Sequence, residues 1–154
     1  MEKQIWPGRS TDQWHFVDRK FLFDWRYRDA SADVFRVLNG NFKLVEKASI
    51  DEAYLDLTED VQRLKETKPQ LTVNDFSTSY LAGIVTKNED ERIDAIEKWL
   101  KDSQTNDSRD DDLLFGAFLV EQIRKKIKDE TGFFCSAGVA RNKVKRKKQV
   151  EISE

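Results

Sequence analysis

Three carboxylates stand close together in the segment KASIDEAYLDLT, Lys47 to Thr58: Asp51, the adjacent Glu52, and Asp56. Carboxylate oxygens are the hard ligands that Mg²⁺ prefers, and the protein usually supplies only a few of them while substrate phosphates and water complete the octahedron. Two adjacent acids at the start of a strand, where the backbone leaves a turn, can reach one point, although neighbours within a strand face apart. Such a pair would suit phosphoryl transfer by two metal ions.

A simpler interpretation of the same acids needs no metal. Acid pairs on hairpins are mostly solvated, or they form ion pairs with neighbouring cations such as Lys43 or Lys47. The pair by itself therefore leaves the metal site and the solvated surface as alternatives, and the surrounding elements have to be considered.

A helix is expected just before these acids. From Trp25 onward, apolar residues recur at spacings of three, four and four, which lays one stripe along a helix: Tyr27, Ala30, Val34 and Leu38. The sequence NGN at Asn39–Asn41 should end it, with Gly40 in the left-handed conformation that closes helices. The segment Met1–Asp24 shows no clear period.

Two extended runs then predict a β-hairpin, Phe42–Lys47 and Ile50–Leu57, joined through the short sequence KAS. In the second strand Asp51, Ala53, Leu55 and Leu57 share one face. The other face carries Ile50, Glu52, Tyr54 and Asp56. Neither face is purely apolar.

The stretch 59–112 is expected to be a long insertion with weak structure. It holds one short amphipathic helix, formed by Ile93, Ile96, Trp99 and Leu100, after a capping box of Thr86 and Glu89. A polar linker, Lys101–Asp112, follows. Its acids lack the spacing of an EF-hand, so we expect a solvated loop.

The clearest helix is Leu113–Thr131, closed by Gly132. One face is apolar and should meet the core, while Glu121 and the lysines point mostly outward; the apolar residues are Leu114, Ala117, Phe118, Val120, Ile123 and Ile127. Phe133–Ala140 then predicts a strand inside a sheet, beside the hairpin. The order helix, strand, strand, insertion, helix, strand indicates an α+β fold.

Composition narrows the class of protein. The chain has 154 residues, a net charge of −2, 38% hydrophobic and 36% charged residues, so one domain with a modest core is expected. The single cysteine, Cys135, excludes an internal disulfide, and His15 has no ligand-spaced companions for zinc. No apolar run is long enough for a membrane span or signal peptide, so we expect a soluble intracellular protein.

Charge is unevenly distributed, because the run RNKVKRKKQ at Arg141–Gln149 is strongly basic while the rest of the chain is acidic. A solvated tail, nuclear targeting and a nucleic-acid contact all remain open for this run.

Whole phrases of the sequence resemble a known family. YRDAS, EKASIDEAYLDLT, DFSTSYLAGI, EKWLKDS and ETGFFCSAGVARNKV occur in this order between Tyr27 and Val144. Together they resemble the palm of Y-family translesion DNA polymerases. The resemblance implies a ferredoxin-like polymerase palm, DNA-directed nucleotidyl transfer opposite damaged template, a nuclear location, Mg²⁺ in a two-metal site, and DNA primer-template and deoxynucleoside triphosphate as partners.

The resemblance also implies roles for single residues. Asp51 and Glu52 match the acids that bind the catalytic metals, whereas Ser49, Tyr54 and Asp56 belong to the same motif as structural residues. Asn142 and Lys143 match a turn on the nucleic-acid and triphosphate side of the palm. Lys147 falls by spacing where the family has a lysine that contacts the triphosphate, although Lys145 and Arg146 replace apolar residues before it.

The departures from the family set the expected organisation. Residues 1–26 are unassigned, 27–144 form a partial palm with the insertion 59–112, and 145–154 are a basic tail. The first central strand, which carries the other catalytic carboxylate, is not found, and neither are fingers or thumb. We therefore expect an incomplete palm that is inactive as an isolated chain. The alternatives are a non-catalytic fragment that binds nucleic acid through the basic tail, or a chain that does not fold stably.

Overall fold

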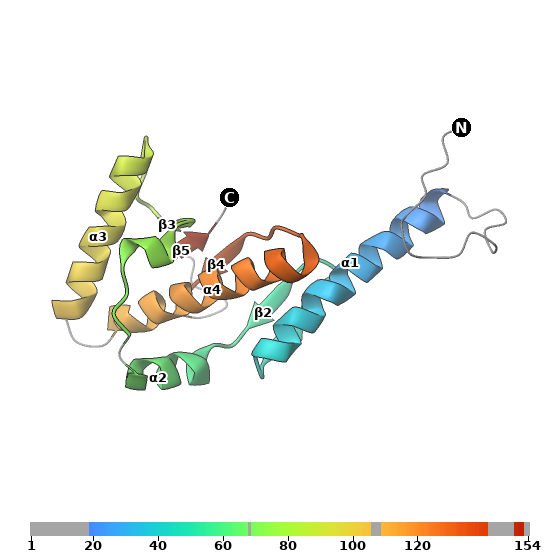
Figure 1. The fold of residues 1–154 in the computed structure, drawn as a ribbon, viewed down its shortest axis with the longest axis horizontal. Helices are drawn as coiled ribbons and strands as arrows, with labels where there is room; N and C mark the ends of the chain where they lie inside the picture. The colour runs from blue at the N-terminus through green and yellow to red at the C-terminus, as the bar shows by residue number, and fades with distance from the viewer. Residues whose placement is uncertain (1–18, 68, 106–108, 142–149, 153–154) are drawn as a thin grey trace.

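The fold is a mixed arrangement of helices and short strands, as the sequence predicts (Figure 1). A computed structural model describes residues 19–67, 69–105, 109–141 and 150–152. Its elements are α1 (Arg19–Asn41), β1 (Val45–Lys47), β2 (Ala53–Leu55), α2 (Thr58–Thr67), the 3₁₀ helix η1 (Val73–Phe76), β3 (Ser79–Leu81), α3 (Glu89–Thr105), α4 (Arg109–Thr131), β4 (Ala137–Val139) and β5 (Val150–Ile152). Across the described ranges, no helix combines the length and apolar character that crossing a bilayer requires.

Helix α4 is central because its two halves belong to two different hydrophobic clusters. Its first half packs with Phe76 of η1 and with Ile96 and Leu100 of α3. Its second half, through Ile123 and Ile127, packs with α1 and the β1–β2 hairpin. In Figure 1, α3 accordingly lies on one side of α4, and α1 lies on the other. The apolar face predicted for this helix is thus confirmed, and it joins the hairpin to the rest of the fold.

The boundary of α1 differs from the prediction. The helix continues through Gly40 to Asn41, and the glycines with positive φ among the described residues are Gly83 and Gly132. Gly40 therefore does not close α1 in the left-handed conformation. Instead the amide of Phe42 donates to the carbonyl of Leu38 (3.0 Å), and Asn41 Nδ2 donates to the carbonyl of Val37 (2.6 Å). At the end of α4, by contrast, Gly132 closes the helix as predicted, and its φ is 75°.

The predicted hairpin is present, but it stands as a separate two-stranded sheet. β1 and β2 are antiparallel, with Val45 opposite Leu55 and Lys47 opposite Ala53. A second sheet has the order β3–β5–β4, with both pairs antiparallel. The expectation that Phe133–Ala140 lies inside a sheet beside the hairpin is wrong. Its strand is limited to β4, which is paired with β5, and Phe133 and Phe134 are exposed before it.

Residues 59–112 are more regular than expected. Most of α2, all of η1, β3 and α3, and the start of α4 fall in this range, and Phe76 and Ile96 in it are fully buried. The capping box of Thr86 and Glu89 is also wrong, because α3 begins at Glu89 and Asn88 Oδ1 accepts from the amide of Glu91 (2.9 Å). The expected linker Lys101–Asp112 instead contributes the end of α3 and the start of α4.

Candidate metal-binding turn

The acids Asp51 and Glu52 lie in the turn between β1 and β2, not in a strand. The turn is Ala48–Glu52, and it is closed by the carbonyl of Glu52, which accepts from the amides of Ala48 (2.9 Å) and Ser49 (3.2 Å). The connection is therefore longer than the predicted KAS. Beyond it, Ala53, Leu55 and Leu57 turn toward the second hydrophobic cluster, so alternation in the strand is confirmed while both acids stay exposed at the tip.

The Asp51 carboxylate is held by a donor on each oxygen. Ser49 Oγ donates to Oδ1 (2.7 Å), and Tyr27 Oη of α1 donates to Oδ2 (3.1 Å). These hydrogen bonds, first from Ser49 and then from Tyr27, lower the pKa of Asp51 from its ordinary value. The same contact raises the pKa of Tyr27. Both hydrogen bonds favour the ionised form of Asp51 and restrain the orientation of its carboxylate.

Glu52 is exposed beside it, and its side chain has no hydrogen bond or ion pair within the described residues. The ion pairs that the sequence offers as an alternative are not formed. Lys43 Nζ binds Glu59 Oε2 (3.0 Å), and Lys47 Nζ donates to Ser31 Oγ (3.3 Å). Both carboxylates of the turn are consequently open to a ligand from outside.

The donor chemistry of this turn fits a hard divalent cation in part. Asp51 and Glu52 supply two carboxylates, which is a usual protein contribution to a Mg²⁺ site completed by phosphate and water. Throughout the part of the chain that the structure describes, no group of three or more candidate ligands is clustered. Asp56 is occupied elsewhere, because its Oδ1 accepts from the Thr58 hydroxyl (2.6 Å) and amide (3.0 Å) at the start of α2.

Acid should weaken the hydrogen bonds between Asp56 and Thr58. The Thr58 hydroxyl and amide lower the pKa of Asp56 from its ordinary value of 3.8. Because the pKa of Asp56 is lower in the folded chain than in the unfolded chain, the contact with Thr58 stabilises the fold at pH values above 3.8. This stabilisation is lost as the pH falls through the folded-state pKa. In denaturant titrations, the stability difference between the wild type and Asp56→Asn should stay constant from neutral pH down to about pH 5 and shrink below 3.8. A difference independent of pH would contradict it.

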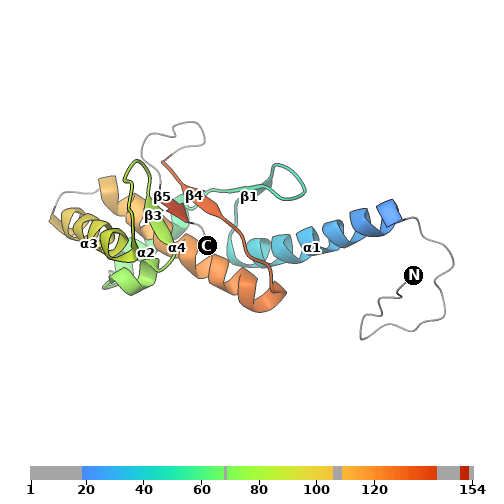
Figure 2. The same cartoon turned by 90° about the horizontal axis from the view of Figure 1, so that it is seen from above.

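Two residues of α1 that sequence reasoning did not assign to the site also contact the turn. Tyr27 was expected in the apolar stripe, yet it is about half exposed (47%) and bonded to Asp51. Ser31, which is largely buried, donates its hydroxyl to the carbonyl of Ile50. Their spacing of four residues indicates that both lie on one face of the helix. It does not indicate that this face contacts the turn. Figure 2 shows the hairpin tip lying over α1.

The predicted nucleotide-binding and DNA-binding residues Asn142, Lys143 and Lys147 lie outside the described residues. The structure therefore brings together Asp51 and Glu52 of the predicted set, and the positions of the other three stay predictions.

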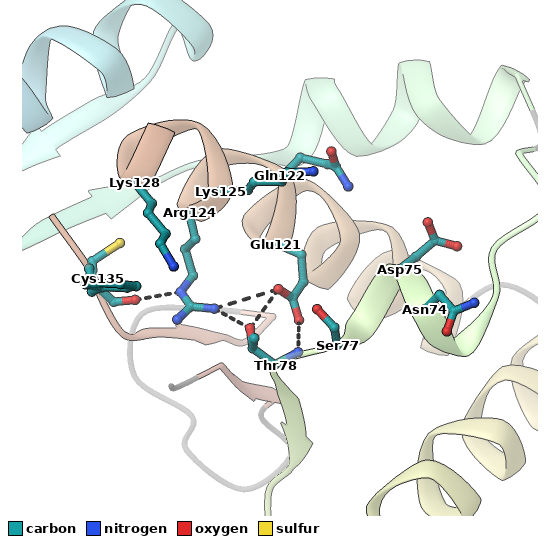
Figure 3. A pocket seen from close by; sticks show the side chains of 11 residues that line it. Asn74, Asp75, Ser77, Thr78, Glu121, Gln122, Arg124, Lys125, Lys128 and Cys135 are labelled. Carbon is teal, nitrogen blue, oxygen red and sulfur yellow. Dashed lines mark hydrogen bonds and ion pairs between the residues drawn. The ribbon is translucent and has the colours of Figure 1, made fainter. Parts of the chain in front are cut away.

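A second polar site lies along α4, apart from the turn. A cavity of about 360 Å³ is lined by η1, by Ser77 and Thr78 between η1 and β3, by α4, and by Phe134 and Cys135 (Figure 3). At its base Glu121 is buried, which contradicts the prediction that this residue points outward. Glu121 accepts from the amide (3.0 Å) and hydroxyl (2.8 Å) of Thr78 and from Ser79 Oγ (2.7 Å). Arg124 Nε donates to the carbonyl of Cys135 (2.6 Å).

A protein family and several known proteins match most of this chain. Residues 24–147 match the impB/mucB/samB family. The chain is 36% identical to DNA polymerase eta of Drosophila melanogaster, over 77% of this chain and 16% of that protein. It is 34% identical to DNA polymerase eta of Arabidopsis thaliana, over 77% of this chain and 18% of that protein. It is 32% identical to N-acetyltransferase eso1 of Schizosaccharomyces pombe, over 75% of this chain and 14% of that protein. The chain thus spans less than a fifth of these relatives.

Proposed function

The chain belongs to the impB/mucB/samB family, which comprises the Y-family DNA polymerases, and on that basis we propose that it forms part of the palm of a DNA polymerase eta-like translesion enzyme. The reaction is nucleotidyl transfer from a deoxynucleoside triphosphate to a primer, opposite damaged template. The observation that carries the proposal is the exposed carboxylate pair in the β1–β2 turn, within the segment that matches the family.

Y-family DNA polymerases use divalent metal ions, and we assign Asp51 and Glu52 as their ligands in this chain. When bound, such ions neutralise charge on the triphosphate and draw it toward the primer oxygen. The task of this chain is to hold the ligands ready. Asp51 is oriented by hydrogen bonds from Tyr27 and Ser49, and Glu52 is free to turn toward the same point.

The proposed domain organisation follows from the same assignment. The succession α1, β1, β2, α4, β4 supports a ferredoxin-like palm over 27–144, with 59–112 as an insertion and 145–154 as a basic tail. Asn142 and Lys143 of that palm, together with Lys147 of the tail, would contact nucleotide or DNA. We place the protein in the nucleus, where its template lies.

The proposal is tested in a complete polymerase, because the chain spans only part of its relatives. Residues 24–147 would replace the matching segment of Drosophila DNA polymerase eta, and primer extension across a damaged template base would be measured. We expect the chimera to extend primers with Mg²⁺. A folded chimera that extends no primer, even on undamaged template, would contradict the proposed function.

A further inference from the structure

The turn that carries the acids is attached to α1 at two points. Tyr27 and Ser31 are four residues apart, so they lie on one face of the helix. Tyr27 Oη donates to Asp51 Oδ2 (3.1 Å), and Ser31 Oγ donates to the carbonyl of Ile50. One contact holds the side chain of the acid, and the other holds the backbone immediately before it.

We propose that Tyr27 and Ser31 are positioning residues for the metal ligand Asp51. This inference rests on the proposed function, because it presumes that the turn binds a divalent cation. Neither residue would touch the metal or the reacting atoms. Both act through Asp51, Tyr27 by orienting its carboxylate and Ser31 by fixing the backbone from which that carboxylate projects.

Tyr27 is needed because Asp51 is exposed. An exposed aspartate samples several side-chain orientations, and a metal ligand that must first be ordered binds more weakly. The hydroxyls of Tyr27 and Ser49 approach different oxygens of Asp51, which fixes the plane of the carboxylate. Each carboxylate oxygen accepts two hydrogen bonds or ligands, so one lone pair on each remains for a cation.

Ser31 has a different task. Its hydroxyl is largely buried, and it accepts from Lys47 Nζ (3.3 Å) while it donates to Ile50. Lys47 lies over the ring of Phe35, 4.4 Å from the ring centroid, so its ammonium group is held against α1. Lys47 at the end of β1 and Ile50 in the turn are therefore both bound to one helix position. The ammonium group of Lys47 therefore stays hydrogen-bonded to Ser31.

The experiment uses the full 154-residue chain and Mn²⁺ as the probe, followed by paramagnetic broadening of backbone amide resonances. Broadening in the wild type should concentrate on the turn 48–52, and in Asp51→Asn, where Glu52 remains, it should need a much higher Mn²⁺ concentration. Partners that orient metal ligands typically contribute 10–100-fold in affinity, so Tyr27→Phe should weaken Mn²⁺ binding by about 10-fold. Tyr80→Phe, a matched change on β3 in the other sheet, should leave binding unchanged.

Two further measurements separate positioning from a structural role. In the Asp51→Asn background, Tyr27→Phe should cause no further loss of Mn²⁺ affinity, since its partner is already removed. Ser31→Ala should speed hydrogen exchange at the amides of Ala48 and Ser49, which close the turn, and should also weaken Mn²⁺ binding. The thermal midpoint of Tyr27→Phe should match that of the wild type.

The outcomes distinguish the two proposals. Wild-type binding at the turn combined with an unchanged affinity in both Tyr27→Phe and Ser31→Ala overturns the positioning role alone. An affinity loss for Tyr27→Phe that persists in the Asp51→Asn background also overturns it, because Tyr27 would then act on the fold. If the wild type shows no Mn²⁺ broadening at the turn, the metal assignment fails and the positioning role fails with it.

Discussion

Replacing Glu121 with alanine should lower the free energy of unfolding by about 3–5 kcal/mol, the usual cost of removing one partner of a buried ion pair. Glu121 and Arg124 are both buried on α4, with 3.7 Å between Arg124 Nη1 and Glu121 Oε2. Ser79, which is fully buried, would lose the acceptor of its hydroxyl. Equilibrium denaturation in urea measures this loss directly.

Two variants show where the loss comes from. Glu121→Gln keeps an acceptor for Thr78 and Ser79 but removes the charge, so it should cost less than alanine. Glu130→Ala removes a carboxylate from the same helix whose pairs with Arg36 (3.1 Å) and Lys126 (4.0 Å) are partly exposed, and it should cost less than about 1 kcal/mol. A loss for Glu121→Ala no larger than that for Glu130→Ala would contradict the importance of this network.

The second large effect concerns activity. In the chimera with Drosophila DNA polymerase eta, Asp51→Asn should lower the rate of primer extension by roughly 10³-fold, because a bound metal contributes several kcal/mol of charge stabilisation in the transition state. Asparagine has nearly the same shape, and Asp51 is exposed at a turn, so the fold should tolerate the change. Steady-state single-nucleotide insertion kinetics measure the loss.

Controls tie this loss to the carboxylates. Glu52→Gln should also reduce insertion strongly. The Asp51→Asn and Glu52→Gln chimeras should keep the melting temperature of the parent. Asp56→Asn serves as the matched aspartate change, because Asp56 binds the Thr58 hydroxyl and amide at the start of α2. This variant should leave insertion within about a few-fold of the parent. Insertion by Asp51→Asn at the parental rate would disprove the assignment of this residue.

Local pattern was sufficient for the elements that carry the turn. Alternation in 50–57 predicts a strand whose Ala53, Leu55 and Leu57 share a face, and these residues do pack together. The spacing of Ile123 and Ile127 and the final Gly132 likewise predict the second half of α4. Both signals lie within a few residues, so no distant partner is needed to read them.

Features that depend on distant partners were missed. α2, which is rich in charge and buries Val61, was not predicted as a helix, because a ten-residue segment with so little apolar surface is recognised as a helix only once its packing partners are known. β5 follows a basic run and forms a strand through pairing with β3 and β4. Glu121 looks like a surface acid until Thr78 and Arg124 are placed beside it.

The candidate site also combines residues that the local sequence indicates with residues whose role depends on distant partners. The adjacency of Asp51 and Glu52 marks them in the sequence, and the hairpin accounts for their exposure. Tyr27 could not be assigned from its helix, because its role depends on a turn more than twenty residues away in the chain. A periodic pattern indicates which face of α1 is apolar, but the hydrogen-bond partner of the Tyr27 hydroxyl depends on the tertiary structure.

The assignment of the metal ligands is tested most directly by anomalous diffraction. Crystals of the chimera would be grown with primer-template, a non-hydrolysable deoxynucleoside triphosphate analogue, and Mn²⁺ in place of Mg²⁺. We expect an anomalous peak at about 2.1 Å from carboxylate oxygens of both Asp51 and Glu52, the distance of a direct metal–oxygen bond. A fully occupied Mn²⁺ peak in contact with neither carboxylate would contradict the account.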